Sequence, residues 1–403
     1  MVSTACPVCA GKRPFCIHKS YPLPRDFNLQ KQVEEKLGKD FFGPSYSVFV
    51  GHYGYPNVNV GPLSALEGAG TGPASWFGKG YKEIITEMSF VVRAKQKESV
   101  FSRARVVADV QELAIAKRPT DTEISYKKQP HYKFSLSDSL QPMGPSAELD
   151  KLRLAENVKV DPKVERIVTD EMKAAEASFE LYSHGQDVYK ITTILSSGVL
   201  GMQDSKKLVP TRWSITAMDD IIAKRLISEV RSFPQAKDFM VFEFQYMDNH
   251  FVTLVMPGNW EFENFEVWAP GSNWSDERLG KAGSALASRI IPEHEPFGGR
   301  KAYAESQAGG YYASRIAAVE YLHGIRKQAK VVTFREVYEG YVWPLGVWVV
   351  RETARKAFAN PRKFGTRQEA LAYAASRLRV PLGEYRKKSK VLGRKTLADF
   401  GQY

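Results

Sequence analysis

The clearest local signal in the chain is a strand-like segment, Tyr46-Ser47-Val48-Phe49-Val50, that leads into Gly51-His52-Tyr53-Gly54-Tyr55-Pro56-Asn57-Val58-Asn59-Val60-Gly61-Pro62. β-Branched and aromatic residues favour an extended strand, whereas glycine and asparagine permit backbone angles that other residues rarely adopt. A loop so rich in glycine, asparagine and aromatic residues is typical of a segment that approaches a ligand or another chain, and equally of a tight, buried turn. The sequence leaves both interpretations open.

Apolar periodicity on both sides of this stretch predicts helices and strands. Helices are expected at 102–117, 170–182, from about Thr216 with that residue as the N-cap, 311–328 and 368–378. Strands are expected at 239–246 and 250–256, joined as a hairpin, and at 330–334 and 347–350. Glu261 and Glu263 are expected on a strand with an exposed carboxylate edge. Because strands and helices do not alternate regularly, the prediction is an α+β fold without a doubly wound sheet.

The domain organisation that we predict has three parts. Residues 26–380 form a single large mixed domain, with a division near residue 150 as the open alternative. A small zinc-knuckle-like segment, residues 1–25, precedes it, and a basic flexible tail, residues 381–403, follows.

Composition limits the partners and the compartment. The 403 residues carry 57 Lys and Arg against 45 Asp and Glu, a formal net charge of +12, which favours polyanionic partners such as DNA. No run of eighteen apolar residues and no signal peptide is present, so we expect a cytoplasmic protein without a membrane partner. The oligomeric state is not indicated by the sequence.

The only three cysteines lie close together near the N-terminus, which argues against a secreted disulfide framework. Cys6 and Cys9 have the Cys-x-x-Cys spacing of a zinc knuckle, and Cys16 with His18 offers two more ligands. We therefore predict one zinc ion held by three cysteines and one histidine, and the alternative is a terminus whose thiols are incidental.

The C-terminal segment 394–403 resembles a sliding-clamp-binding motif. Leu397 and Phe400 lie three residues apart, as the aliphatic and aromatic anchors of that motif do on one turn of short helix. Arg394 stands where the motif usually has glutamine, and Gly401 replaces its second aromatic residue. The alternative is a tail whose two apolar residues fold back onto the protein.

Several longer strings are similar to the Nre family of archaeal DNA repair proteins. They are Phe49–Leu63, Lys207-Leu208-Val209-Pro210-Thr211-Arg212-Trp213-Ser214-Ile215-Thr216, Gly309-Gly310-Tyr311-Tyr312-Ala313-Ser314-Arg315 and Pro344-Leu345-Gly346-Val347-Trp348. The resemblance implies an N-terminal zinc-finger-like segment, a C-terminal peptide that binds the sliding clamp (PCNA), and a role in repairing DNA damage. Family members typically carry four cysteines in the first segment, so a tetrahedral zinc site here requires His18.

A second likeness suggests an enzyme. His184-Gly185, followed by Ile194-Leu195-Ser196-Ser197-Gly198, resembles the first motif of ADP-ribosyltransferases, in which a His-Gly pair holds the nicotinamide ribose of NAD. By this resemblance Tyr311 would stack on nicotinamide, Tyr312 would help to bind NAD, and Glu352 or Glu336 would polarise the ribose. The alternative is an ordinary capped helix and a packed aromatic helix start. Two function classes therefore stay open: a DNA-binding repair factor recruited to the clamp, and an NAD-dependent transferase acting on nucleic acid or protein.

The zinc prediction can be tested by elemental analysis of the purified protein, which should contain one zinc per chain. Cys9→Ser should release the ion and loosen residues 1–25 while the rest stays folded, because zinc binding stabilises only the segment that holds the ion. A preparation without zinc would contradict the prediction.

Overall fold

The computed structural model describes residues 28–66, 72–134, 141–268 and 289–393. These residues form two compact units, the N-terminal unit up to Ile222 and the C-terminal unit from Ala223 onward. The division lies inside helix α8 (Thr211–Val230), and not near residue 150, which the sequence left open as an alternative to a single domain. Both units combine helices with a sheet, which confirms the predicted α+β class.

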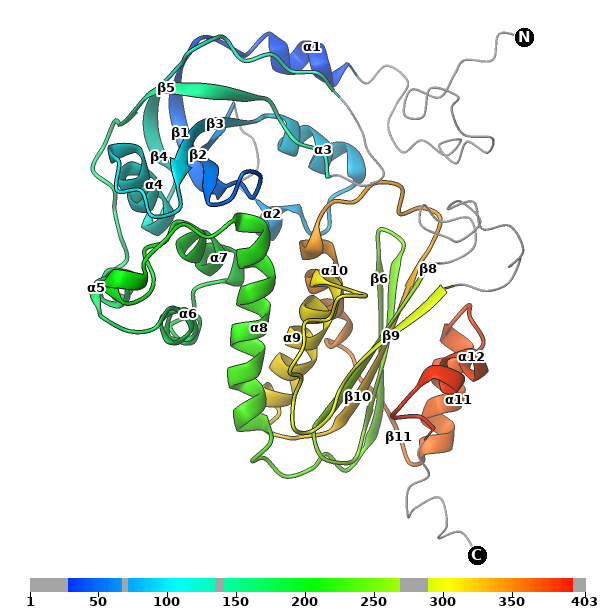
Figure 1. The fold of residues 1–403 in the computed structure, drawn as a ribbon. Coiled ribbons are helices and arrows are strands. Elements are labelled where there is room, and N and C mark those ends of the chain that lie inside the picture. Colours follow the sequence, from blue (N-terminus) through cyan, green and yellow to red (C-terminus); the bar gives the residue numbers. More distant parts are fainter. Residues whose placement is uncertain (1–27, 67–71, 135–140, 269–288, 394–403) are drawn as a thin grey trace, which may run out of the picture. The chain divides into compact units, whose positions relative to one another are not determined.

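A five-stranded closed barrel is the centre of the N-terminal unit (Figure 1). Its strands are β1 (Asp40–Val50), β2 (Asn57–Ala65), β3 (Val91–Ser99), β4 (Thr120–Tyr126) and β5 (Ser146–Leu154). The strand order is β1-β2-β3-β5-β4, closed by antiparallel pairing of β1 with β4, and only the β3–β5 pair is parallel. With α4 (Arg105–Ile115) between β3 and β4, this is the topology of an OB fold.

The barrel explains the stretch at which the sequence was ambiguous. Val58 and Val60 are fully buried while Asn57 and Asn59 are exposed, which is the period-two pattern of a strand with one face in the core. The loop between β1 and β2 is therefore only Gly51–Pro56. At Gly61 the β2 backbone passes so close to β3 that a Cβ atom would lie 1.9 Å from the carbonyl oxygen of Ala94.

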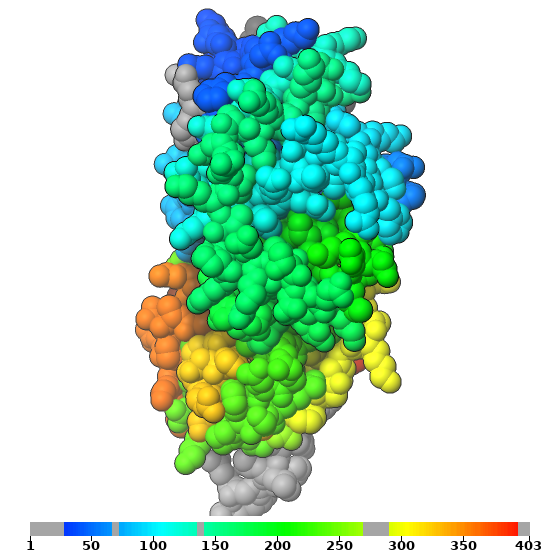
Figure 2. All heavy atoms as spheres, turned by 90° about the vertical axis from the view of Figure 1, so that its left-hand side faces the viewer, coloured from blue at the N-terminus to red at the C-terminus, as the bar shows by residue number. Residues whose placement is uncertain are grey.

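Helices surround this barrel and extend the unit. They are α1 (Leu29–Glu34), α2 (Pro73–Trp76), α3 (Tyr81–Ser89), α5 (Pro162–Thr169), α6 (Ala174–Ser183), α7 (Val188–Ser196) and a 3₁₀ turn, Gln203–Ser205. Figure 2 shows the side of the unit on which residues of α4 to α6, coloured cyan to green, form a continuous surface. The predicted helices at 102–117 and 170–182 are confirmed as α4 and α6. Thr216 is not an N-cap, because α8 already begins at Thr211, directly after Pro210.

The C-terminal unit is a six-stranded mixed sheet between two layers of helices (Figure 1). The strand order is β11-β6-β7-β10-β8-β9, and only β10 and β8 are parallel. The bounds are β6 (Phe239–Tyr246), β7 (Asn249–Met256), β8 (Glu261–Trp268), β9 (Arg289–Glu295), β10 (Lys330–Val337) and β11 (Arg362–Phe364). Helices α9 (Gly309–Gly324) and α10 (Val347–Ala357) cover one face, and α11 (Arg367–Arg377) and α12 (Leu382–Lys388) cover the other.

The predicted β6–β7 hairpin is confirmed, with a two-residue turn in which Met247 and Asp248 both have positive φ. Two other expectations were wrong. Residues 347–350 begin helix α10, because their apolar side chains continue to Ala354 and Ala357 with helical spacing. Glu263 is fully buried, since β8 is an inner strand, and its carboxylate accepts from the backbone N–H of Lys390 (2.7 Å).

Residues 382–392 are folded, where the sequence predicted a flexible tail from residue 381. Tyr385, Val391 and Leu392 join the apolar cluster between the sheet and α11. The hydroxyl of Tyr385 donates to the buried carboxylate of Glu336 (2.8 Å). Basic residues dominate this segment by number, but its apolar side chains are buried against the sheet.

Glu336 fastens the C-terminal helices to the sheet. Its carboxylate also accepts from the hydroxyl of Tyr338 (2.7 Å) and from the backbone N–H groups of Arg379 and Val380 (both 2.9 Å). Four donors around one buried carboxylate compensate for its loss of water.

Removing one of these donors should weaken the attachment. Tyr385→Phe keeps the ring but deletes the hydroxyl, so we expect the free energy of unfolding to fall by about 1–3 kcal/mol. Urea denaturation followed by tryptophan fluorescence measures this loss. Tyr373→Phe, on the half-exposed side of α11, is the matched control and should change stability little.

Candidate nucleic-acid interface

The outer face of strands β2 and β3 carries an alternating row of polar and basic side chains. In the antiparallel register Asn57 pairs with Ser99 and Asn59 with Lys97, and no register shift occurs before Leu63 pairs with Arg93. Because Val58 and Val60 point into the barrel, Asn57, Asn59 and Lys97 point outward, and they are exposed. Lys95 and Arg93 continue the same row along β3.

The basic side chains of β3 differ in how firmly they are held. Arg93 is half-buried and donates through Nη2 to the carbonyl of Gly144 (3.2 Å), in the loop between β4 and β5. Burial lowers the pKa of its guanidinium. Lys95 donates to the hydroxyl of Ser146 on β5 (3.3 Å), whereas Lys97 extends into solvent. Along the row, the cations therefore go from the half-buried, hydrogen-bonded Arg93 to the exposed Lys97.

A carboxylate also lies near this row. Glu148 on β5 pairs in register with Lys95, but its side chain forms an ion pair with Lys127 (2.6 Å). The hydrogen bond from Lys127 lowers the pKa of Glu148 and raises that of Lys127. Since this acid has its own cation, it subtracts little from the positive charge of β3.

Three separate segments meet at one end of the row. The backbone N–H of Val100 donates to the carbonyl of Pro56, and that of Leu208 donates to the carbonyl of Val100 (both 2.8 Å). The backbone N–H of Val50 donates to the hydroxyl of Thr211 (2.9 Å), the first residue of α8. The loop 51–56, the end of β3 and the start of α8 therefore form one continuous surface.

This surface is rich in exposed aromatic side chains. Among the described residues seven aromatic side chains of Phe, Tyr and Trp are exposed, and four of them lie here: Tyr53, Tyr55, Phe101 and Trp213. The rings of Tyr55 and Trp213 are 5.1 Å apart, and the Lys207 ammonium lies 5.8 Å from the ring centre of Phe101. We call Asn57, Asn59, Lys95, Lys97 and these four aromatic residues the barrel face.

The sequence indicated only part of the barrel face. For the loop with Tyr53 and Tyr55 the sequence left two interpretations open, a segment that approaches a ligand and a tight, buried turn, and Trp213 lies in one of the strings quoted for the family resemblance. Arg93, Lys95 and Lys97 were missed. The signal was present in Val92-Arg93-Ala94-Lys95-Gln96-Lys97, because every second residue is a cation, as expected of a strand with one solvent face.

The residues proposed for NAD binding belong to different units. His184 ends helix α6 of the N-terminal unit, and its Nε2 lies 3.1 Å from Oε1 of Glu180. Gly185 follows with φ of +86°, the usual conformation of the glycine that ends a helix. These contacts describe a capped helix end.

Tyr311, Tyr312 and Glu352 lie in the C-terminal unit. Tyr311 is fully buried, and its hydroxyl donates to Glu295 (3.1 Å). Burial raises the pKa of Tyr311, and the nearby Glu295 raises it further. Tyr312 is buried, and its hydroxyl accepts from the backbone N–H of Ala304 (3.1 Å). Glu352 is on helix α10 and pairs with Arg355 (3.1 Å). The NAD hypothesis stays a prediction from the sequence.

The predicted zinc ligands Cys6, Cys9, Cys16 and His18, and the clamp-binding residues Arg394, Leu397 and Phe400, lie outside the described residues. Within the described ranges no group of three or more His, Cys, Asp or Glu side chains is placed to hold a metal ion. No helix in that part of the chain is long and apolar enough to cross a membrane.

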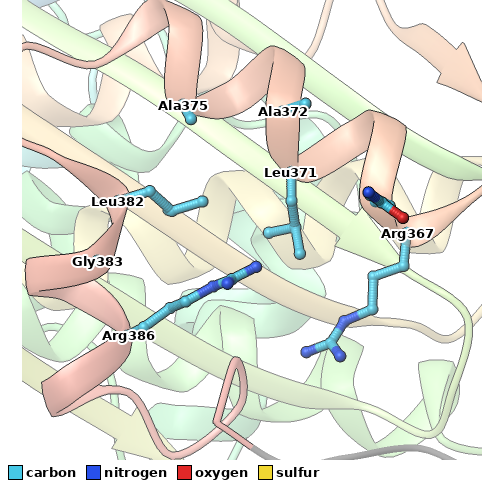
Figure 3. Close-up of a pocket in the computed structure, with 8 residues that line it drawn as sticks. Arg367, Leu371, Ala372, Ala375, Leu382, Gly383 and Arg386 are labelled. Carbon is cyan, nitrogen blue, oxygen red and sulfur yellow. The ribbon is translucent and has the colours of Figure 1, made fainter. Parts of the chain in front are cut away.

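A shallow pocket of about 340 Å³ lies between α11 and α12 (Figure 3). Leu371, Ala372, Ala375 and Leu382 give it an apolar lining, and Arg367 and Arg386 stand at its rim. The guanidinium of Arg367 also donates to the carbonyl of Leu392 (2.9 Å), close to where the described chain ends. Among the described residues, the pocket has no aromatic residue in its lining and only a few polar ones, unlike the barrel face.

The barrel places the N-terminal unit in a class of folds that bind oligonucleotides or oligosaccharides on strands 2 and 3 and on the loops between strands 1 and 2 and strands 4 and 5. Comparison with known sequences is more specific. The sequence model described as "Archaeal Nre, N-terminal" matches residues 15–275, and that described as "Archaeal Nre, C-terminal" matches residues 295–400. The chain belongs to the archaeal Nre family, as the resemblance predicted.

Curated relatives match over nearly their whole length. The chain is 36% identical over 384 residues to "DNA repair protein NreA" of Archaeoglobus fulgidus, covering 94% of this chain and 95% of the relative. It is 34% identical over 405 residues to "DNA repair protein NreB" of the same organism, covering 98% and 99%. It is also 34% identical to "DNA repair protein NreA" of Haloferax volcanii, covering 94% and 93%. No solved structure matches the chain.

Proposed function

We propose that this protein is a DNA-repair factor that binds DNA through the barrel face and is recruited to a replication sliding clamp by its C-terminal residues. The repair role is supported by the names of its relatives, each of which is called a DNA repair protein. The DNA contact is supported by one observation above all: the row of cations on β3 lies on the strands with which barrels of this topology bind oligonucleotides.

Electrostatics agrees with a nucleic-acid ligand. Each lysine that neutralises a phosphate releases condensed counterions, so a protein with a formal net charge of +12 is attracted to DNA at low salt. The side chains of Asn57 and Asn59 offer neutral hydrogen-bond donors and acceptors beside the cations. No recognition-helix motif stands out in the sequence, so we expect little sequence preference.

The clamp contact and the zinc site are proposed from the sequence. Leu397 and Phe400 supply the two anchors of the clamp-binding motif, and the basic residues before them face an acidic clamp surface in this proposal. Three cysteine thiolates and one histidine imidazole form a donor set that suits tetrahedral zinc. The zinc would order residues 1–25 and present Lys12, Arg13 and Lys19 to DNA.

The DNA contact predicts a specific loss when cations of the barrel face are removed. Lys95→Ala with Lys97→Ala should weaken DNA binding and lower the slope of log affinity against log salt by about one for each lysine that contacts a phosphate. Titration of labelled DNA at several salt concentrations measures both quantities. Lys163→Ala with Lys173→Ala, two exposed lysines around α5 and α6, should leave the slope unchanged. An affinity that does not depend on salt would contradict the proposal.

The clamp contact predicts that two anchors carry the affinity. Burial of each apolar side chain contributes on the order of 1.5–3 kcal/mol, so Leu397→Ala with Phe400→Ala should cost about a hundredfold or more in affinity for the clamp. Calorimetry or surface plasmon resonance with the purified clamp measures this. Thr396→Ala with Gln402→Ala keeps both anchors and should bind like the wild type. Clamp binding that survives the loss of both anchors would show that docking occurs elsewhere.

A further inference from the structure

The aromatic half of the barrel face is not explained by charge attraction. Tyr53 is 78% exposed, Phe101 61%, Trp213 47% and Tyr55 43%, although these are among the side chains that burial stabilises most. They come from three segments that the backbone hydrogen bonds of Pro56, Val100 and Leu208 hold together. Large rings kept in solvent at one place indicate a ligand with flat, apolar faces.

The placement of these rings restricts the form of the DNA. In a duplex, each base is stacked on its neighbours and shows the protein only its edges in the grooves. In a single strand, the base faces become available, and aromatic side chains bind them by stacking, with little dependence on sequence. Tyr53, at the tip of the loop, and the Tyr55–Trp213 pair stand at the end of the cationic row, where a strand held by Lys97 would pass.

We propose that the barrel face is selective for single-stranded DNA, with unpaired bases stacked on Tyr53, Tyr55, Phe101 and Trp213 and phosphates bound by Lys95, Lys97 and Lys207. This inference rests on the proposed DNA-binding function and adds to it the strandedness of the ligand. The ammonium of Lys207, which lies over Phe101, is the cation at the aromatic end. Asn59 lies beside Lys97, and Asn57 lies one step nearer the aromatic end, opposite Ser99; both can bond to base edges or sugars.

The aromatic surface fits a nucleic acid better than an apolar protein partner. Its rings are interleaved with Lys97 and Lys207, both exposed, and lysine is depleted from protein interfaces. Exposed rings beside cations are the combination by which non-sequence-specific proteins bind single strands.

The test compares one oligonucleotide in two forms, with the full chain throughout. A labelled mixed-sequence single strand should bind more tightly than the same strand annealed to its complement, as measured by fluorescence anisotropy. Tyr53→Ala and Trp213→Ala should each weaken single-strand binding roughly 5- to 150-fold, while duplex binding and the salt slope stay as in the wild type. Tyr53→Phe, which keeps the ring, should bind like the wild type.

A matched control excludes a general effect of removing an exposed ring. Phe42, 68% exposed at the other end of β1, lies outside the barrel face, so Phe42→Ala should leave single-strand binding unchanged. Single-stranded DNA should also quench tryptophan fluorescence in the wild type and less so in Trp213→Phe, which reports a base on that ring directly.

The outcomes separate this inference from the proposed function. If both forms of DNA bind equally and the ring variants behave like the wild type, while Lys95→Ala with Lys97→Ala weakens binding, the barrel face binds DNA but does not select single strands, and the inference is wrong. If neither form binds, the DNA-binding function fails and the inference fails with it. Retained DNA binding with loss of a protein contact in the ring variants would assign the aromatic surface to a protein instead.

Discussion

The close passage of β2 over β3 at Gly61 is the constraint on which the N-terminal unit depends. Any side chain there would collide with the backbone of Ala94, so only glycine lets these two strands keep an unbroken register from Asn57 to Ala65. That register decides which residues face outward together, and it is the reason that asparagines of one strand stand beside lysines of the other. The same register fixes where β2 begins, at Asn57. It therefore fixes where the loop 51–56 ends and where Tyr53 and Tyr55 lie.

Much of the fold could be predicted from periodicity, and the exceptions have physical causes. The β6–β7 hairpin and helix α9 were predictable because their patterns run long enough to exclude the alternative. Helix α10 was not, because Val347-Trp348-Val349-Val350 taken alone reads equally well as a strand, and the helical spacing shows only when the pattern is followed to Ala354 and Ala357. Residues 382–392 were predicted to be flexible because lysine and arginine are so frequent among them. Their few apolar residues are nevertheless placed where the sheet and α11 can bury them.

The candidate site was predictable to a smaller extent for a different reason. Aromatic and glycine-rich segments marked the loop and the start of α8, but nothing in a linear sequence says that Tyr55 and Trp213, 158 positions apart, are neighbours. That fact depends on the packing of the start of α8 against the end of β1, where the backbone N–H of Val50 donates to the hydroxyl of Thr211. The cations of β3 needed the strand assignment before their common direction had a meaning.

The folded segment that ends at Gly393 would constrain the proposed recruitment to a clamp. With Leu392 packed against the sheet and its carbonyl held by Arg367, only residues 394–396 separate the body from Leu397. Three residues span at most about 10 Å, so a short linker would connect the C-terminal unit to a clamp that held this anchor. A linker of that length would give the C-terminal unit a high effective concentration at the clamp surface. It would also restrict the orientations that the unit can take there. Inserting glycines after Gly393 would lengthen the linker, so that the unit could reach farther but would be held less firmly in one orientation.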